Sequence, residues 1–207
     1  QFRRALRDGV RPDGAHYFPA LPYTSFTGMT DADIGDLWAY LRTVPASPQA
    51  NRPHDLGFPF NIRLAMIGWK ALFFTPGAFR PDATKSAQVN RGAYLVNALG
   101  HCGECHTPRN FAGGLDRSKW LAGGVLPEGA APNLTPHPET GLGKWSDGDF
   151  TDLLKMGMTS EGDFVGGEMA EVVKETTGKL TDEDLKAVIA YLRSLAPVEN
   201  RVRKPKS

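Results

Sequence analysis

Apolar residues recur at helical spacing in several stretches of the chain, and three of these stretches begin with a residue that can cap a helix. Thr30, Ser146 and Thr181 are each followed three positions later by an aspartate. The hydroxyl can accept a hydrogen bond from an orphan backbone amide, and the acid lies at the positive end of the helix. The pattern predicts a mainly α-helical chain, with these residues facing inward: Ile34, Leu37, Trp38 and Leu41 in the first stretch, Phe150, Leu153 and Leu154 in the second, and Leu185, Val188, Ile189 and Leu192 in the third.

A further helix is predicted over residues 87–100, ending at Gly100. Its segment Gly92-Ala93-Tyr94 offers small residues, which predicts close packing against another helix. Residues 107–145 are instead rich in glycine and proline with weak periodicity, so we expect irregular loops there.

Directly after the predicted helix comes Cys102-Gly103-Glu104-Cys105-His106, which contains both cysteines of the chain. The C-x-x-C-H spacing is typical of covalent haem c attachment, with two thioethers to the haem and His106 as an iron ligand. A redox dithiol would need a different flanking pattern, and a zinc site would need a second pair of ligands. We therefore expect one covalently attached haem c in this chain.

The iron needs a sixth ligand or an open site, and a methionine thioether would favour ferrous iron and raise the potential. Met169 lies in the segment Gly166-Gly167-Glu168-Met169, far downstream of His106, where we expect a loop that folds over the second haem face. Met156 and Met158 fall on or at the end of an apolar-periodic segment, which predicts core positions. We therefore expect Met169 to be the axial ligand.

An internal repeat supports this choice. Residues 2–14 resemble residues 150–162 at an offset of 148, and residues 30–42 resemble residues 181–193 at an offset of 151. Self-similarity of this kind indicates two copies of one structural unit. By the same offset, the attachment motif of the first copy would lie about forty positions before Gln1. We therefore expect residues 1–45 to be the C-terminal half of a first haem unit whose attachment half is not in this sequence. The alternative is a relict half domain with no haem of its own.

Several residues near the motif are candidates for contacts with the haem edge. Arg109 could pair with a propionate, and Asn133, Thr135 and Trp145 could donate hydrogen bonds to propionates or pack on the haem. Each could equally be an ordinary loop residue.

Composition narrows the function classes. The apolar fraction of 41% supports packed cores, and the net charge of +1 argues against a nucleic-acid binder. No stretch of eighteen apolar residues is present. Residues 46–85 are predicted to be a linker with an aromatic-rich helix, which either packs between the domains or docks to a partner subunit or a membrane surface. Residues 201–207 form a basic tail.

The chain resembles the multihaem, dihaem-type cytochrome c proteins that serve as electron-transfer subunits of periplasmic alcohol dehydrogenases and molybdenum hydroxylases. The resemblance is carried by Phe18-Pro-Ala-Leu-Pro-Tyr23, Phe58-Pro-Phe-Asn-Ile-Arg63, the segment from Asn90 to Val96, the segment from His101 to Arg109, and Pro132-Asn-Leu-Thr135. It implies two or three haem domains with His/Met ligation. Together with the repeat, it predicts cytochrome c-like helical haem domains in tandem, the first one N-terminally incomplete and the second complete over residues 86–200. It also implies a periplasmic protein, soluble or peripherally membrane-associated, with a redox protein or dehydrogenase subunit as partner.

One departure from the family concerns the first copy. Related proteins often carry a methionine where this chain has Leu21, and leucine cannot bind iron. Met29 is the candidate ligand for a first haem, although it aligns with the apolar Leu180 of the second copy.

The preferred function is transfer of single electrons towards the respiratory chain, with no catalytic residues. The alternative is a haem enzyme, peroxidase-like or acting on sulfur compounds, that uses an open first haem.

Overall fold

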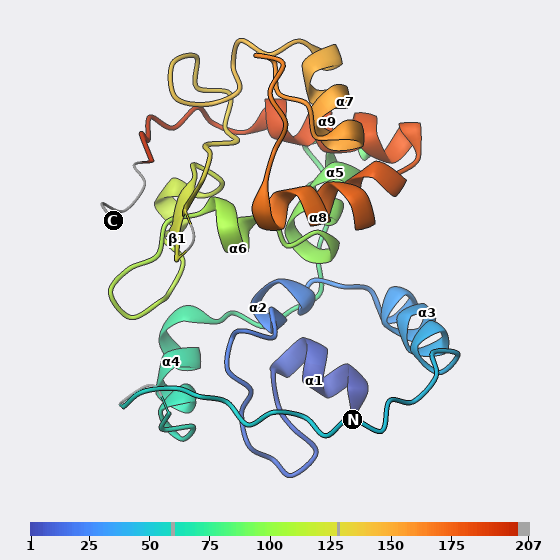
Figure 1. Ribbon diagram of the computed structural model, residues 1–207, viewed down its shortest axis with the longest axis vertical. Helices are drawn as coiled ribbons and strands as arrows, with labels where there is room; N and C mark the ends of the chain where they lie inside the picture. The colour runs from blue at the N-terminus through green and yellow to red at the C-terminus, as the bar shows by residue number, and fades with distance from the viewer. Residues whose placement is uncertain (59–60, 128, 203–207) are drawn as a thin grey trace. The chain divides into compact units, whose positions relative to one another are not determined.

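The computed structural model describes residues 1–58, 61–127 and 129–202, and it separates into two compact units, residues 1–80 and 81–207. Both are built mainly from helices, as the capping and periodicity patterns predict (Figure 1). The first unit contains α1 (Phe2–Asp8), α2 (Tyr23–Phe26), α3 (Asp31–Leu41) and α4 (Ala65–Phe73). The second contains α5 (Ala87–Tyr94), η1 (Leu95–Leu99), α6 (Gly103–His106), η2 (Arg117–Lys119), β1 (Gly124–Leu126), β2 (Gly129–Ala131), α7 (Asp147–Met156), α8 (Gly167–Glu175), η3 (Thr177–Lys179) and α9 (Asp182–Ser194).

All three predicted helix starts are present. Thr30, Ser146 and Thr181 each accept a hydrogen bond from the backbone amide three residues on. Ser146 and Asp149 form a reciprocal capping box, because the Asp149 carboxylate also accepts a hydrogen bond from the Ser146 amide at 2.7 Å. Each cap of this kind contributes about 1 kcal/mol to helix stability.

The core of the second unit forms where α5 and η1 cross α9. Gly92 makes this crossing possible, since a Cβ there would lie 1.9 Å from the Ala187 carbonyl oxygen. The predicted inward face of α9 is buried, and it packs with residues from η1 and α7 in one cluster. The cluster consists of Leu95, Val96, Leu121, Leu142, Phe150, Leu154, Leu185, Val188, Ile189 and Leu192.

The end of the helix before the haem motif differs from the expectation. The α-helix stops at Tyr94 and continues as a π-helix to Leu99, where the Gly100 amide donates to the Leu95 carbonyl at 2.7 Å. His101 then has a φ of 38°, which is uncommon for a residue other than glycine. π-helical segments often occur at functional sites, and this one ends three residues before Cys102.

Among its described residues, the glycine- and proline-rich region 107–145 is mostly irregular, and it contains the short helix η2 and one short hairpin that its periodicity did not reveal. Within it, β1 pairs antiparallel with β2, and Val125 lies opposite Ala130. Three-residue strands carry too little alternation to be recognised in a sequence.

The two copies of the repeat adopt the same local geometry. Gly9 ends α1 and Gly157 ends α7, both in the left-handed conformation. After them, Val10 bridges to His16, and Met158 bridges to Phe164. Each pair of equivalent residues is separated by 148 positions, so the similarity of the two sequences corresponds to the same backbone turn.

The predicted inward face of α3 is only partly buried. Ile34 is buried, but Trp38 and Leu41 are 48% and 41% exposed, while their α9 counterparts Ile189 and Leu192 are buried. The physical reason is that α9 has α5 packed against it, and no element in the described part of the first unit covers α3 in the same way. Met156, which periodicity assigned to the core, is also exposed.

The segment after residue 45 packs within the first unit. Lys70 on α4 is buried, and its Nζ donates to the carbonyl oxygens of Asp8 and Gly9 at the end of α1. Arg63 donates to the His16 carbonyl and stacks on Phe18. The aromatic-rich helix predicted here spans only Ala65–Phe73, which is shorter than the aromatic stretch of the sequence. Pro59 and Phe60 lie outside the described residues.

Candidate haem-attachment site

The attachment motif forms the short helix α6, which places both cysteines and the histidine within one turn. The His106 amide donates to the Cys102 carbonyl at 2.9 Å, and the Cys102 amide donates to the Val96 carbonyl of η1. Gly103 packs closely against Trp120, because a Cβ there would lie 2.3 Å from the end of the Trp120 ring, which would have to move.

His106 is buried and oriented by a single hydrogen bond. Its Nδ1 lies 2.8 Å from the Pro132 carbonyl oxygen, so Nδ1 carries the proton and donates. Burial lowers the pKa of His106, against the opposite effect of this hydrogen bond. The ring is therefore neutral at pH 7. Its Nε2 has no hydrogen-bond partner within the described residues, which is the form in which imidazole binds a metal.

The two thiols are not activated for redox chemistry. Burial raises the pKa of Cys102 to about 11 and also raises the pKa of Cys105. A reactive dithiol needs a lowered pKa, so the surroundings disfavour a thioredoxin-like role. Across residues 1–58, 61–127 and 129–202, the structure contains no group of three or more histidine, cysteine or acidic side chains that could hold a metal ion. The residues present fit covalent haem attachment.

Met169 lies in the first turn of α8, whereas its glycine-rich surroundings predicted a loop. It is partly buried. The negative charge of the preceding residue, Glu168, contributes to raising the pKa of Cys105. The start of α8 therefore lies near the attachment motif, and Figure 1 draws α8 beside α6.

The segment that carries Met169 also contains polar atoms without partners. The hydroxyl oxygens of Thr159 and Thr177 are buried and have no hydrogen-bond partner among the described residues. Buried hydroxyls are normally satisfied by protein, water or a bound group. These two are consistent with a bound group or ordered water next to this segment.

The predicted propionate contacts are engaged within the protein. Arg109 pairs with Glu104 of the attachment motif, with Nη2 2.7 Å from Oε2. The Asn133 Oδ1 accepts from the amide and hydroxyl of Thr135, and its Nδ2 donates to the Val198 carbonyl and the Thr140 hydroxyl. Trp145 packs against the core and lies edge-on to Phe150. Roles of these residues toward a haem stay predictions.

Met29 lies in the first unit, apart from the attachment motif in the chain. Its side chain is buried, and its carbonyl accepts a hydrogen bond from Arg7 at 2.7 Å. Its role as a ligand is not decided by these contacts.

Sequence reasoning missed three residues that shape the site. Pro132 supplies the carbonyl for His106, and Trp120 packs on Gly103. Thr107 is buried, and its hydroxyl accepts from the Leu121 amide at 3.0 Å. The position of Thr107 directly after the motif was visible in the sequence, but the other two contacts depend on how the loop folds.

A chain with this motif geometry in a small helical unit has the features of a c-type cytochrome. The sequence model of the family described as cytochrome c matches residues 89–196. The chain belongs to the cytochrome c family, whose domains carry covalently attached haem c.

Similar proteins include a "Diheme cytochrome c-type" protein of Cereibacter sphaeroides, 46% identical over 94% of this chain and 64% of the relative. The "Fructose dehydrogenase cytochrome subunit" of Gluconobacter japonicus is 42% identical over 94% of this chain and 40% of the relative. The "Alcohol dehydrogenase (quinone), cytochrome c subunit" of Gluconobacter oxydans is 38% identical over 95% of this chain and 43% of the relative. The chain thus spans less than two thirds of the length of each of these relatives.

Proposed function

We propose that this chain transfers single electrons from a dehydrogenase partner towards the respiratory chain. In the proposal, a haem c bonded to Cys102 and Cys105 has His106 and Met169 as its axial ligands. The observation that carries the proposal is the buried, neutral His106 ring, whose Nδ1 donates to Pro132 while Nε2 is left for a metal.

The haem supplies the one-electron chemistry, and the residues of the chain set its conditions. Pro132 orients the His106 ring and makes it a better donor to a metal. A methionine thioether as the second protein ligand would stabilise the reduced state and raise the potential. With two protein ligands, the iron would have no open position for a substrate. Electron transfer therefore requires little movement of the protein.

The location of α8 supports Met169 as the sixth ligand. The charge of Glu168 acts on the Cys105 thiol, and Met169 is the next residue. Asn133 and Thr135 hold the loop after Pro132 through their mutual hydrogen bonds. We propose Arg109 and Trp145 as residues at the edge of the haem site.

A substitution of Met169 tests this ligand assignment. We expect Met169→Ala to keep the thioether bonds and the fold, to lower the reduction potential, and to open ferrous iron to carbon monoxide. Met156→Leu is the matched control, because Met156 is exposed on α7, and it should leave both properties unchanged. A Met169→Ala protein with the parent potential and no carbon monoxide binding would refute Met169 as the ligand.

We further propose that residues 1–45 are the C-terminal half of a first haem domain, followed by a connecting segment over residues 46–85 and a complete domain over residues 86–200. The repeated turn after Gly9 and Gly157 supports this, as do the exposed Trp38 and Leu41 on α3. A helix equivalent to α5 would cover that face. Met29 is the candidate ligand for the first haem.

Counting haems tests the tandem arrangement. Intact mass and a pyridine haemochrome spectrum of the full-length protein should give two or more haems c per chain. One haem per chain would leave the first unit without a haem, and its role would then be packing or docking.

The partner and the location follow from the named relatives and from haem c chemistry. Several relatives are cytochrome subunits of dehydrogenases, and covalent haem attachment on the outer side of the bacterial cytoplasmic membrane indicates the periplasm. In the described parts of the chain, no helix combines the length and apolarity needed to cross a bilayer. Exposed Leu64 just before α4, together with exposed Ile67 and Leu72 on α4, supports contact with a membrane surface. Copurification of a dehydrogenase subunit that reduces the haem in rapid-mixing experiments tests the partner, and flotation with anionic vesicles tests the surface contact.

A further inference from the structure

A single lysine joins the two ends of the segment that carries Met169. This segment, residues 157–180, runs from the end of α7 to the start of α9. Lys155, in the last turn of α7, donates from Nζ to the carbonyl oxygen of Leu180, and Nζ lies 3.7 Å from the Asp182 carboxylate. The Lys155 side chain is 26% exposed and the Asp182 side chain is 86% exposed, so the hydrogen bond to the Leu180 carbonyl is the contact that is partly shielded from water.

The backbone at each end is closely packed as well. Gly157 ends α7 in the left-handed conformation, and its carbonyl accepts from the Val165 amide at 2.9 Å. At the other end, a Cβ on Gly178 would lie 2.7 Å from the Val173 carbonyl oxygen and 3.2 Å from that of Lys155. The two ends of the segment thus lie close together and are joined by Lys155, and Met169 lies in the middle of the segment.

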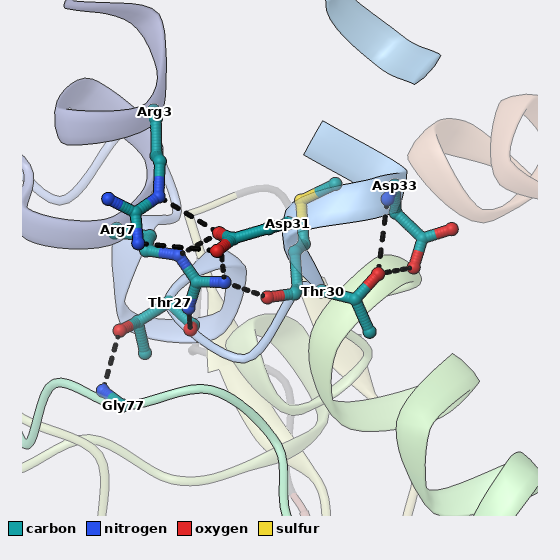
Figure 2. A network of polar contacts seen from close by, with 8 residues as sticks. Arg3, Arg7, Thr27, Thr30, Asp31, Asp33 and Gly77 are labelled. Carbon is teal, nitrogen blue, oxygen red and sulfur yellow. Dashed lines mark hydrogen bonds and ion pairs between the residues drawn. The ribbon is translucent and has the colours of Figure 1, made fainter. Parts of the chain in front are cut away.

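The first copy of the repeat contains the same arrangement with a different cation. Arg7 occupies the position of Lys155 at the offset of 148, and Met29 and Asp31 occupy those of Leu180 and Asp182 at the offset of 151. Arg7 donates to the Met29 carbonyl at 2.7 Å, and its Nη2 lies 2.9 Å from the Asp31 carboxylate. Figure 2 shows Arg7 between Thr27 and Asp31, with Arg3 on the same carboxylate.

A lysine in one copy and an arginine in the other therefore contact equivalent carbonyl oxygens and equivalent aspartates. A contact that served only to neutralise a surface charge would not need the carbonyl oxygen in both copies. Closing a loop with a charge-assisted hydrogen bond reduces the conformations that the loop can adopt. The shared element is thus a closure between the helix before the segment and the start of the helix after it.

We propose that Lys155 is a positioning residue that keeps Met169 on the haem iron by closing the base of residues 157–180. The inference rests on the proposed His106/Met169 ligation. Lys155 does not touch the iron site, and it acts through the ends of the segment. Without this closure, the segment opens more often and the thioether leaves the iron for a larger fraction of the time.

The test compares Lys155→Gln with Lys155→Arg in the haem-loaded protein. Lys155→Gln should increase the rate of carbon monoxide binding to ferrous haem by about tenfold or more, since a hydrogen bond to a charged group contributes about 1.5–3 kcal/mol and 1.4 kcal/mol corresponds to a factor of ten. It should also lower the reduction potential and speed amide hydrogen exchange in residues 157–180. Lys155→Arg, which introduces the cation of the first copy, should remain within about twofold of the parent in all three.

Arg91→Gln is the control for a purely structural effect. It removes a bidentate ion pair between α5 and Asp184 of α9, with distances of 2.7 and 2.8 Å, and Asp184 lies outside residues 157–180. An equal increase in carbon monoxide binding in Arg91→Gln, or no increase in Lys155→Gln, would overturn the proposal. If Lys155→Gln does not load haem, Lys155→Met keeps the apolar part of the side chain and removes both contacts, and faster carbon monoxide binding and exchange in that variant support the proposal while parent values refute it.

Met169→Ala separates this proposal from the one on which it rests. If Met169→Ala does not open the iron, the ligand assignment itself is wrong. If Met169→Ala opens the iron but Lys155→Gln does not, only the positioning role of Lys155 fails.

Discussion

The crossing of α5 and α9 provides a sharp test of how the second unit is held together. Gly92 lies at the crossing, and a methyl group there would meet the Ala187 carbonyl oxygen at 1.9 Å and the Tyr191 Cβ at 2.8 Å. Ordinary Cβ contacts lie at 3.4–4 Å, so the two backbones would have to separate by about 1.5 Å locally. The obstructing atom belongs to backbone, which has no alternative rotamer.

The size of the effect follows from two opposing contributions. Inserting a methyl group into a well-packed interface costs about 1–3 kcal/mol. Alanine in place of glycine within a helix gains about 0.8–1.0 kcal/mol. We therefore expect Gly92→Ala to lower the free energy of unfolding by up to about 2 kcal/mol. With a urea m-value of about 2 kcal/mol/M, the unfolding midpoint should fall by up to about 1 M.

Gly148→Ala is the matched control. Gly148 lies in the first turn of α7, and a Cβ there would meet only the Ser146 hydroxyl at 3.5 Å. This variant should be unchanged or stabilised by up to about 1 kcal/mol. Urea unfolding of the haem-loaded protein, followed by far-ultraviolet circular dichroism, measures both. If Gly92→Ala were as stable as Gly148→Ala, close contact at residue 92 would not be what defines the crossing.

Two further predictions concern buried polar side chains. Burial lowers the pKa of Lys70 from 10.5 to about 8, so between these values the unfolded chain holds a proton that the folded protein has released, and stability rises with pH in that window. The melting temperatures of the parent and Lys70→Met should therefore differ in their slope between pH 8 and 10.5, and parallel curves would contradict the buried position. Asn133→Leu should destabilise the second unit by about 2 kcal/mol, because it leaves the buried Thr135 amide without its acceptor and removes one of the two hydrogen bonds to the Val198 carbonyl. Chemical denaturation measures this loss, and the exposed Asn51→Leu should stay within about 0.5 kcal/mol of the parent.

The helices that begin at Thr30, Ser146 and Thr181 could be predicted because their signals are local. A capping hydroxyl, an acid three residues later and an apolar stripe all lie within one or two turns. The attachment motif is local in the same way, since two thiols and one imidazole must fit within one helical turn. The internal repeat was also visible, because residues at offsets of 148 and 151 adopt the same turn and the same cap.

The amino-acid sequence by itself determined that the chain is helical, repeated and suited to covalent haem attachment, because each of these properties depends on residues close together in the chain. Only the tertiary structure decided that the Pro132 carbonyl orients His106, that Asn133 is engaged within the protein, and that Trp38 is uncovered. It also brought Lys155 to Leu180, twenty-five positions away. These contacts depend on which loops and helices meet across the fold, and no spacing within a single element specifies them.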